Sequence, residues 1–226
     1  MGVQSPSTQP THATASNRKG PPYVRQHSII LNKGEKKTVN MGGRCYIWKI
    51  EDDGETTRIQ GPRCTDNFQI VNPGFRYMDS EWFSVEQAFQ AIKFPDGSLA
   101  RSEIHGTTPE SGESDEEYGL RVWSLGQPRG DSTMRDDWEQ EKVKVMLLLN
   151  LAKYASDADL QDELVATDGF SIEAKVSTGN WKHWNECTQI WIRQILMAQE
   201  DLKATIRFIE NMSAEDVQYM LDSVRP

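Results

Sequence analysis

From residue 84 onward, the chain repeatedly carries the sequence signature of a helix start. Ser84-Val-Glu-Gln87 has the pattern of a capping box, with Ser84 at the N-cap and Gln87 at the third helical position. Capping residues also stand at 156–159 and 213–216. The spacing of apolar residues predicts helices at 84–93, 134–154 and 186–209, a shorter one through Leu160 and Leu164, and a last one after Ser213. Most of the fold is therefore expected to be helical.

Before residue 84 the pattern favours strands. The segments 45–50 and 56–60 flank Asp53-Gly54, which is a strong hairpin signal. We expect one further short strand at 68–71 and a strand-like segment at 170–173. Together these elements predict an α+β fold that is predominantly helical, with a small antiparallel sheet near its start. Residues 1–28 are rich in Ser, Thr, Pro and Gly and predict a disordered basic leader, followed by a single domain over 29–226.

The formal charge of −9 is unevenly distributed along the chain. Residues 1–40 carry six basic side chains against Glu35, a balance of +5, so the remaining residues carry −14. This excludes a protein that holds nucleic acid by bulk charge alone. Residues 103–117 hold six acids and no base, and we expect a solvated acidic loop there, with an acidic partner site as the alternative.

Composition also constrains the setting in which the chain works. No apolar run reaches the roughly 18 residues that a membrane-spanning helix needs, so no membrane partner is expected. The three cysteines form no CxxC pair and are read as free thiols, which favours an intracellular location, cytoplasmic or nuclear. None of the four histidines has metal-ligand spacing to another, and no nucleotide-binding motif is present, so we predict neither a metal nor a cofactor.

The segment Trp82–Phe94 is the most distinctive part of the sequence. On its helix, Glu86, Gln90 and Lys93 share one face, at positions i, i+4 and i+7. The axial separation of Glu86 and Lys93 is about 10.5 Å, which suits two groups that reach a ligand between them. The competing interpretation is an amphipathic helix whose Glu/Gln/Lys face is solvated.

Aromatic and basic side chains supply further candidates for binding. The stretch Gly179–Trp184 is expected in a loop, where Trp181 and Trp184 could stack on a purine or pyrimidine ring or cap the edge of the core. Arg63, Arg121 and Arg129 fall in or next to predicted loops and helix ends, where a pyrophosphate could be bound bidentately.

Several of these residues also form a pattern that resembles the NADAR (YbiA-like) superfamily. The match begins with Asn67-Phe68 and is most specific from Ser84-Val85-Glu86 through Phe89-Gln90 to Lys93-Phe94. Looser similarity extends the pattern from about Arg63 to Lys203, through Asp137-Trp138, Lys142, Met146, Lys153, Thr167-Asp168 and Leu196-Met197.

This resemblance implies a YbiA-like fold and an N-glycosidase, which cleaves the bond between a ribose anomeric carbon and a nitrogen. The substrates that it implies are ADP-ribosylated guanine in nucleic acid or aminated pyrimidine intermediates of riboflavin synthesis. It places Glu86 and Lys93 in the catalytic pocket, with no cofactor. The residues expected to bind the substrate are Asn67, Phe68, Gln90, Arg63, Trp123, Trp138, Trp181 and Trp184.

The chain also departs from the family pattern. The family's glycine-rich stretch is replaced by the shorter Ser177–Asn185, and Glu200 stands where a late arginine is expected. Two alternatives therefore stay open beside removal of ADP-ribose from guanine. One is an N-glycosidase of free nucleotide-like metabolites, and the other is a catalytically inactive module that binds ADP-ribose.

Overall fold

The structure is a computed structural model that describes residues 43–127 and 132–224. The predicted leader at 1–28 and the candidate Arg129 lie outside the described residues. Within them, the helices are α1 (Val85–Ile92), α2 (Leu99–His105), α3 (Asp115–Leu125), α4 (Trp138–Ser156), α5 (Ala158–Val165), α6 (Trp181–Met197), α7 (Leu202–Glu210) and α8 (Ala214–Asp222). A short 3-10 helix, η1, covers Arg63–Thr65, and the strands are β1 (Tyr46–Ile50), β2 (Thr56–Gln60), β3 (Phe75–Tyr77), β4 (Ser80–Trp82) and β5 (Ser171–Glu173). The predicted α+β class is confirmed.

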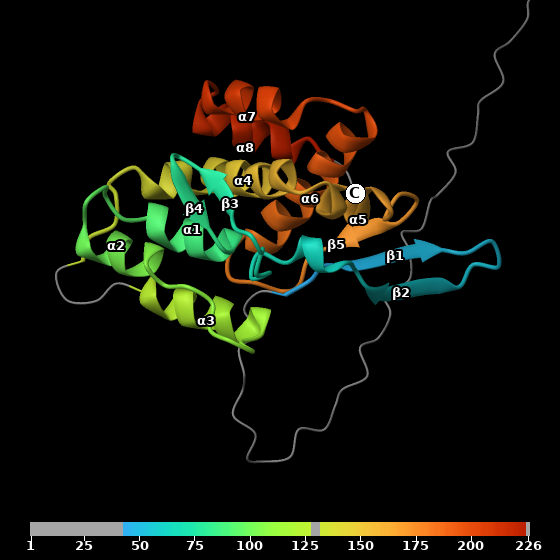
Figure 1. The fold of residues 1–226 in the computed structure, drawn as a ribbon. Coiled ribbons are helices and arrows are strands. Elements are labelled where there is room, and N and C mark those ends of the chain that lie inside the picture. Colours follow the sequence, from blue (N-terminus) through green and yellow to red (C-terminus); the bar gives the residue numbers. More distant parts are fainter. Residues whose placement is uncertain (1–42, 128–131, 225–226) are drawn as a thin grey trace, which may run out of the picture. The chain divides into compact units, whose positions relative to one another are not determined.

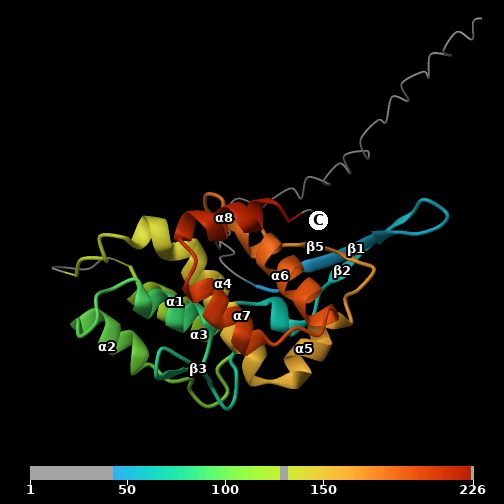
Figure 2. The ribbon, with the colours of Figure 1, turned by 90° about the horizontal axis from the view of Figure 1, so that it is seen from above.

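The strands form two small antiparallel sheets. The first has the order β2-β1-β5, so the predicted hairpin is joined by the strand-like segment near residue 172, with Ile47 opposite Ile172. The tip of the β1–β2 hairpin extends away from the helices in both views (Figure 1 and Figure 2). The second sheet is the hairpin β3–β4, which the sequence did not predict. Its turn places Met78 and Asp79 at φ 50° and 58°, a conformation for which Asn or Gly is the usual signal.

Helix α4 lies at the centre of the helical part. It contacts α1 on one side and α7 and α8 on another, and these three layers are visible in Figure 1. Its residues Leu147 and Leu151 belong to a core with α5, α6 and β5, whereas Met146 and Leu149 belong to a second core with α1 and β4. A helix buried on two sides is apolar over most of its circumference, which explains the unbroken run Val145–Leu149.

Three sequence-based boundaries are wrong. The segment 68–71, expected to be a strand, is a loop in which the side chains of Phe68 and Val71 are buried. The helix expected at 186–209 is two helices, because the chain turns at Gln199 (φ 57°) and Asp201 caps α7 by accepting from the Lys203 and Ala204 amides. Helix α4 begins at Trp138 rather than at Met134.

The acidic segment 103–117 is also only partly a loop. Glu103 belongs to α2, and Asp115, Glu116 and Glu117 form the first turn of α3, where acids stabilise the positive end of the helix dipole. Ser114 and Glu117 form a capping box, which the interpretation of this segment as an acidic loop did not predict. Three of the acids are paired: Glu110 and Glu113 with Arg121, and Asp115 with Arg63. The expectation of a solvated loop over 103–117 therefore holds only for the part between α2 and α3.

Candidate functional site

Helix α1 is held at its N-terminal end by side chains that precede it or belong to it. The Ser84 hydroxyl accepts from the Gln87 amide, so the predicted N-cap is confirmed. Gln87 Oε1 accepts from the Phe83 amide rather than from Ser84, and its Nε2 donates to backbone carbonyls of 104–107. All eight residues of α1 are buried, including Glu86 and Gln90. The interpretation of a solvated Glu/Gln/Lys face is therefore excluded.

The three polar residues of this face form a hydrogen-bonded relay. Gln90 Nε2 donates to Glu86 Oε1 at 2.8 Å, and Lys93 Nζ donates to Gln90 Oε1 at 2.9 Å. Gln90 thus bridges the acid and the amine, which form no ion pair of 4.0 Å or less. Each of the three side chains is less than a tenth exposed, so the relay works in a poorly solvated environment where electrostatic effects are strong.

Burial changes the titration of both ends of this relay. Burial raises the pKa of Glu86 to about 7, although the hydrogen bond from Gln90 and the charge of Lys93 act in the opposite direction. Burial also lowers the pKa of Lys93, and the nearby Glu86 carboxylate opposes that change. A carboxyl group that titrates near neutral pH can both hold and release a proton under physiological conditions.

Glu86 lies in the wall of a cavity of about 120 Å³, here called the Glu86 cavity. Its walls come from the 67–68 loop, α1, α3, α4 and the start of α6. The lining residues are Asn67, Phe68, Glu86, Phe89, Gln90, Trp123, Met146, Ser177, Thr178, Trp181 and Asn185. Small-molecule pockets usually measure roughly 300–1,000 Å³. The Glu86 cavity therefore has room for one end of a nucleotide-sized ligand, and the rest would extend beyond it.

Helix α3 approaches the cavity through two glycines, one within the helix and one at its C-cap. A Cβ atom on Gly119 would lie 2.2 Å from the Phe68 ring, and one on Gly126 would lie 1.9 Å from Gln90 Oε1. Both distances are far shorter than a carbon atom tolerates. The absence of side chains at these two positions therefore lets α3 pack against Phe68 and Gln90 and places Trp123, between them in sequence, in the cavity wall.

Six of the sequence-predicted site residues come together in the wall of this cavity: Asn67, Phe68, Glu86, Gln90, Trp123 and Trp181. Four others do not line it. Lys93 lies behind Gln90, and Trp138 is 4% exposed and packs on Phe89 with ring centroids 4.8 Å apart. Trp184 packs edge-on against Trp181, and Arg63 makes a bidentate ion pair with Asp115.

The stretch Gly179–Trp184 differs from the sequence-based expectation. It was expected in a loop, but α6 begins at Trp181, so both tryptophans belong to its first turn. Trp181 meets Phe89 edge-to-face at 5.2 Å and still lines the cavity. The structure adds Asn185, one turn along α6, together with Ser177 and Thr178. No sequence signal distinguishes Asn185, because its role depends on the contact between α6 and the 67–68 loop.

Helix α6 also carries an arrangement of the kind used in thiol catalysis. Cys187 Sγ lies 3.6 Å from His183 Nδ1, and His183 Nε2 lies 2.9 Å from Asp222 Oδ1. The thiol, however, is 1% exposed, and burial raises its pKa to about 11. A neutral, buried thiol is a poor nucleophile, so this cluster links α6 to α8 rather than forming a second catalytic site.

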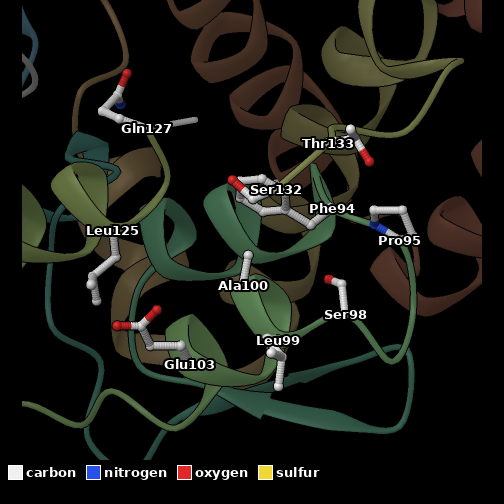
Figure 3. A pocket seen from close by; sticks show the side chains of 10 residues that line it. All are labelled: Phe94, Pro95, Ser98, Leu99, Ala100, Glu103, Leu125, Gln127, Ser132 and Thr133. Carbon is white, nitrogen blue, oxygen red and sulfur yellow. The ribbon is translucent and has the colours of Figure 1, made fainter. Parts of the chain in front are cut away.

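A larger cavity of about 440 Å³ lies beside α2 and the end of α3. Figure 3 shows Phe94, Ala100 and Leu125 around it, with Glu103 as the one ionisable side chain among the lining residues that are described. Glu103 is exposed, whereas Glu86 is buried and is linked through Gln90 to Lys93. Within residues 43–127 and 132–224, no cluster of His, Cys, Asp and Glu is suited to a metal ion, and no helix has the length and apolar character needed to cross a membrane.

Comparison with known proteins gives one result. No protein-family model matches the sequence, and no curated protein does either. Among solved structures, the chain is similar to the NMR structure of the E. coli protein YbiA, with a TM-score of 0.46 and 22% sequence identity over 60% of this chain and 79% of that one. The match is a partial likeness between folds and carries no information about activity.

Proposed function

We propose that this protein is an N-glycosidase that hydrolyses the bond between a ribose and a nucleobase nitrogen, and that its substrate is ADP-ribosylated guanine in nucleic acid. The observation that carries this proposal is Glu86, a carboxyl group in a cavity wall whose pKa of about 7 suits proton transfer. The substrate is taken from the resemblance of the Ser84–Phe94 block to the NADAR superfamily.

The proposed reaction breaks the C1′–N bond and forms a C1′–O bond to water. The electron pair of the broken bond stays on the nucleobase nitrogen, and positive charge develops at the anomeric carbon. The Glu86 carboxylate stabilises that charge and accepts a proton from the attacking water. A proton taken up by the leaving nitrogen completes the balance. The ring of Trp123 or Trp181 is a suitable stacking surface for the base or the ribose.

Two roles are open to Lys93. As a cation, it lowers the pKa of Glu86 across Gln90 and favours the carboxylate. As a neutral amine, it could attack the aldehyde of an opened ribose and form an imine with loss of water, which is the role that the family resemblance implies. Because Lys93 lies behind Gln90, the imine requires the amine to leave Gln90 Oε1. Borohydride trapping followed by mass spectrometry decides between the roles, and an unmodified Lys93 during turnover would exclude the imine.

The direct test of the function is release of ADP-ribose from ADP-ribosylated guanine in DNA. A Glu86→Gln variant is expected to lose activity by roughly 100-fold or more, as for removal of a general base. Glu55→Gln makes the same chemical change at an exposed position in the β1–β2 turn and should leave the rate unchanged. A folded wild-type protein that releases no ADP-ribose would refute this choice of substrate.

A specific observation also favours the free-metabolite alternative. Residues 41–226 carry a charge of −14, which repels the phosphate backbone of a nucleic acid. Turnover of a riboflavin-pathway intermediate, with a rate that does not depend on salt, would support this alternative. Binding of ADP-ribose without turnover of either substrate would instead support the inactive module.

A further inference from the structure

A continuous chain of polar side chains connects the interior of the protein with the Glu86 cavity. Tyr154 OH donates to Gln189 Oε1 at 2.6 Å, and Gln189 Nε2 donates to Asn150 Oδ1 at 3.0 Å. Asn150 Nδ2 donates to Asn67 Oδ1 at 3.2 Å, and Asn67 Nδ2 donates to Asn185 Oδ1 at 3.3 Å. Tyr154, Gln189 and Asn150 are each no more than 2% exposed, whereas Asn67 and Asn185 line the cavity.

The direction of this chain is fixed by the Met146 carbonyl. Asn150 Nδ2 also lies 3.1 Å from the Met146 carbonyl oxygen, which can only accept a hydrogen bond. The amide of Asn150 must therefore present its nitrogen to Met146 and its oxygen to Gln189. Because Gln189 Nε2 donates to Asn150 Oδ1, the Gln189 oxygen faces the Tyr154 hydroxyl, whose single hydrogen then goes to Gln189 at 2.6 Å rather than to the Cys64 carbonyl at 2.9 Å. A reversed amide at either position would bring two donors or two acceptors together inside the protein, which is costly.

This fixed direction determines the polarity of the cavity wall. Because Asn67 Oδ1 accepts from Asn150, Asn67 faces Asn185 with its nitrogen, and Asn185 Oδ1 is used in turn. An amide nitrogen carries two hydrogens, so Asn67 retains one N–H beyond its bond to Asn185. Within the described residues, no protein group accepts a hydrogen bond from Asn185 Nδ2. The Asn67 backbone carbonyl also accepts from the Glu86 amide at 2.9 Å, which places this donor pair beside Glu86.

We propose that Asn67 and Asn185 form a hydrogen-bond donor wall that binds an oxygen of the substrate that carries no proton, either a carbonyl or a phosphoryl oxygen. Asn150, Gln189 and Tyr154 are then positioning residues that set the polarity of this wall. The inference deepens the proposed function, on which it rests for the use of the cavity. It adds a specificity rule: an amino group at the same place would meet two donors and leave them unpaired.

Two nucleosides that differ at one exocyclic group test the carbonyl case. Inosine has an oxygen at C6 and adenosine an amino group, so wild-type protein should bind inosine roughly 10-fold more tightly or better. Titration with each nucleoside is followed through the side-chain amide resonances of Asn67 and Asn185, which are assigned from the Asn67→Asp and Asn185→Asp variants. Inorganic pyrophosphate tests the phosphoryl case: it should bind wild type and lose roughly 10-fold or more in affinity in Asn67→Asp.

The positioning residues are tested by the inosine-to-adenosine affinity ratio. Asn150→Asp removes the nitrogen that binds Met146 and Asn67, and the ratio should fall towards 1, whereas general damage would weaken both ligands equally. Tyr154→Phe removes only the hydroxyl and provides the same test if Asn150→Asp does not fold. If pyrophosphate proves to be the ligand, the measured quantity is instead its affinity for these two variants, which should be lower than for wild type. Asn211→Asp is the matched control, because Asn211 is exposed and also donates to a backbone carbonyl.

The outcomes separate this inference from the proposed function. A preference for inosine identifies a carbonyl oxygen, and pyrophosphate binding that depends on Asn67 identifies a phosphoryl oxygen. Two results together would overturn the donor wall, even in a protein with glycosidase activity. The first is equal affinity for the two nucleosides. The second is pyrophosphate that either does not bind wild type or binds Asn67→Asp as tightly as wild type. Since every measurement is of binding, a protein without turnover can still confirm the donor wall.

Discussion

Replacing Glu86 by Gln gives the sharpest test of the buried relay, because it changes stability in a way that depends on pH. The pKa of Glu86 rises from 4.5 in the unfolded chain to about 7 in the folded protein. Between these values the folded protein holds a proton that the unfolded chain has released. The protonated carboxyl therefore contributes fully to stability below pH 4.5, and this contribution is lost as the pH rises through 7.

The size of the effect follows from the shift. Each pKa unit corresponds to about 1.4 kcal/mol, so deprotonation of Glu86 costs the folded state about 3 kcal/mol at pH 8. Glu86→Gln removes this cost, since a glutamine cannot ionise and its oxygen can still accept from Gln90. Relative to wild type, the variant should gain about 3 kcal/mol of unfolding free energy between pH 4 and pH 8. At this chain length such a gain corresponds to a rise in Tm of roughly 6–12 °C.

The assay is urea denaturation of both proteins at intervals from pH 4 to pH 8.5. Other carboxylates contribute equally to both proteins and cancel in the difference. Lys93 titrates in the opposite sense, because its pKa is lowered on folding. Since the Glu86 carboxylate raises the pKa of Lys93, this pKa falls further in the variant, and the change adds to the variant's gain in stability as the pH rises. Glu55→Gln should run parallel to wild type over the whole range. A difference between Glu86→Gln and wild type that stays constant with pH would refute the argument that burial controls Glu86.

Three further predictions concern the walls of the site. Gly126→Ala should destabilise the protein by about 1–3 kcal/mol and reduce turnover, because its Cβ would displace Gln90. Thermal unfolding and turnover assays measure the two effects, and Gly106→Ala is the milder control, because a Cβ there would lie 3.3 Å from its nearest neighbouring atom. Trp123→Ala should weaken substrate binding by about 1–3 kcal/mol and Trp123→Phe by much less, so calorimetry that shows equal losses would exclude stacking. Lys153→Met should lower the free energy of unfolding by about 1–3 kcal/mol, because the Lys153 ammonium donates to the Cys64 and Asp66 carbonyls in the segment before Asn67. Urea denaturation measures this loss, and an unchanged midpoint would contradict the role.

Local patterns in the sequence determined a substantial part of this fold. The first hairpin, the N-cap at Ser84 and the helical character of α1, α4, α5 and α8 follow from capping, turn chemistry and apolar spacing, which act between near neighbours. The shared face of Glu86, Gln90 and Lys93 follows in the same way from the helical repeat. Each of these features depends on residues a few positions apart, so the sequence is sufficient to show it.

The tertiary structure alone decided the environment of those residues. The sequence gives no sign that α3 would pack over Gln90 through Gly126, or that Asn185 from α6 would meet Asn67 across the cavity. It predicted a solvated acidic loop where Arg63 and Arg121 pair with Asp115 and Glu113. Burial and amide direction arise from contacts between segments that are distant in sequence, and these contacts turn an acidic side chain on a helix into a group that titrates near neutral pH.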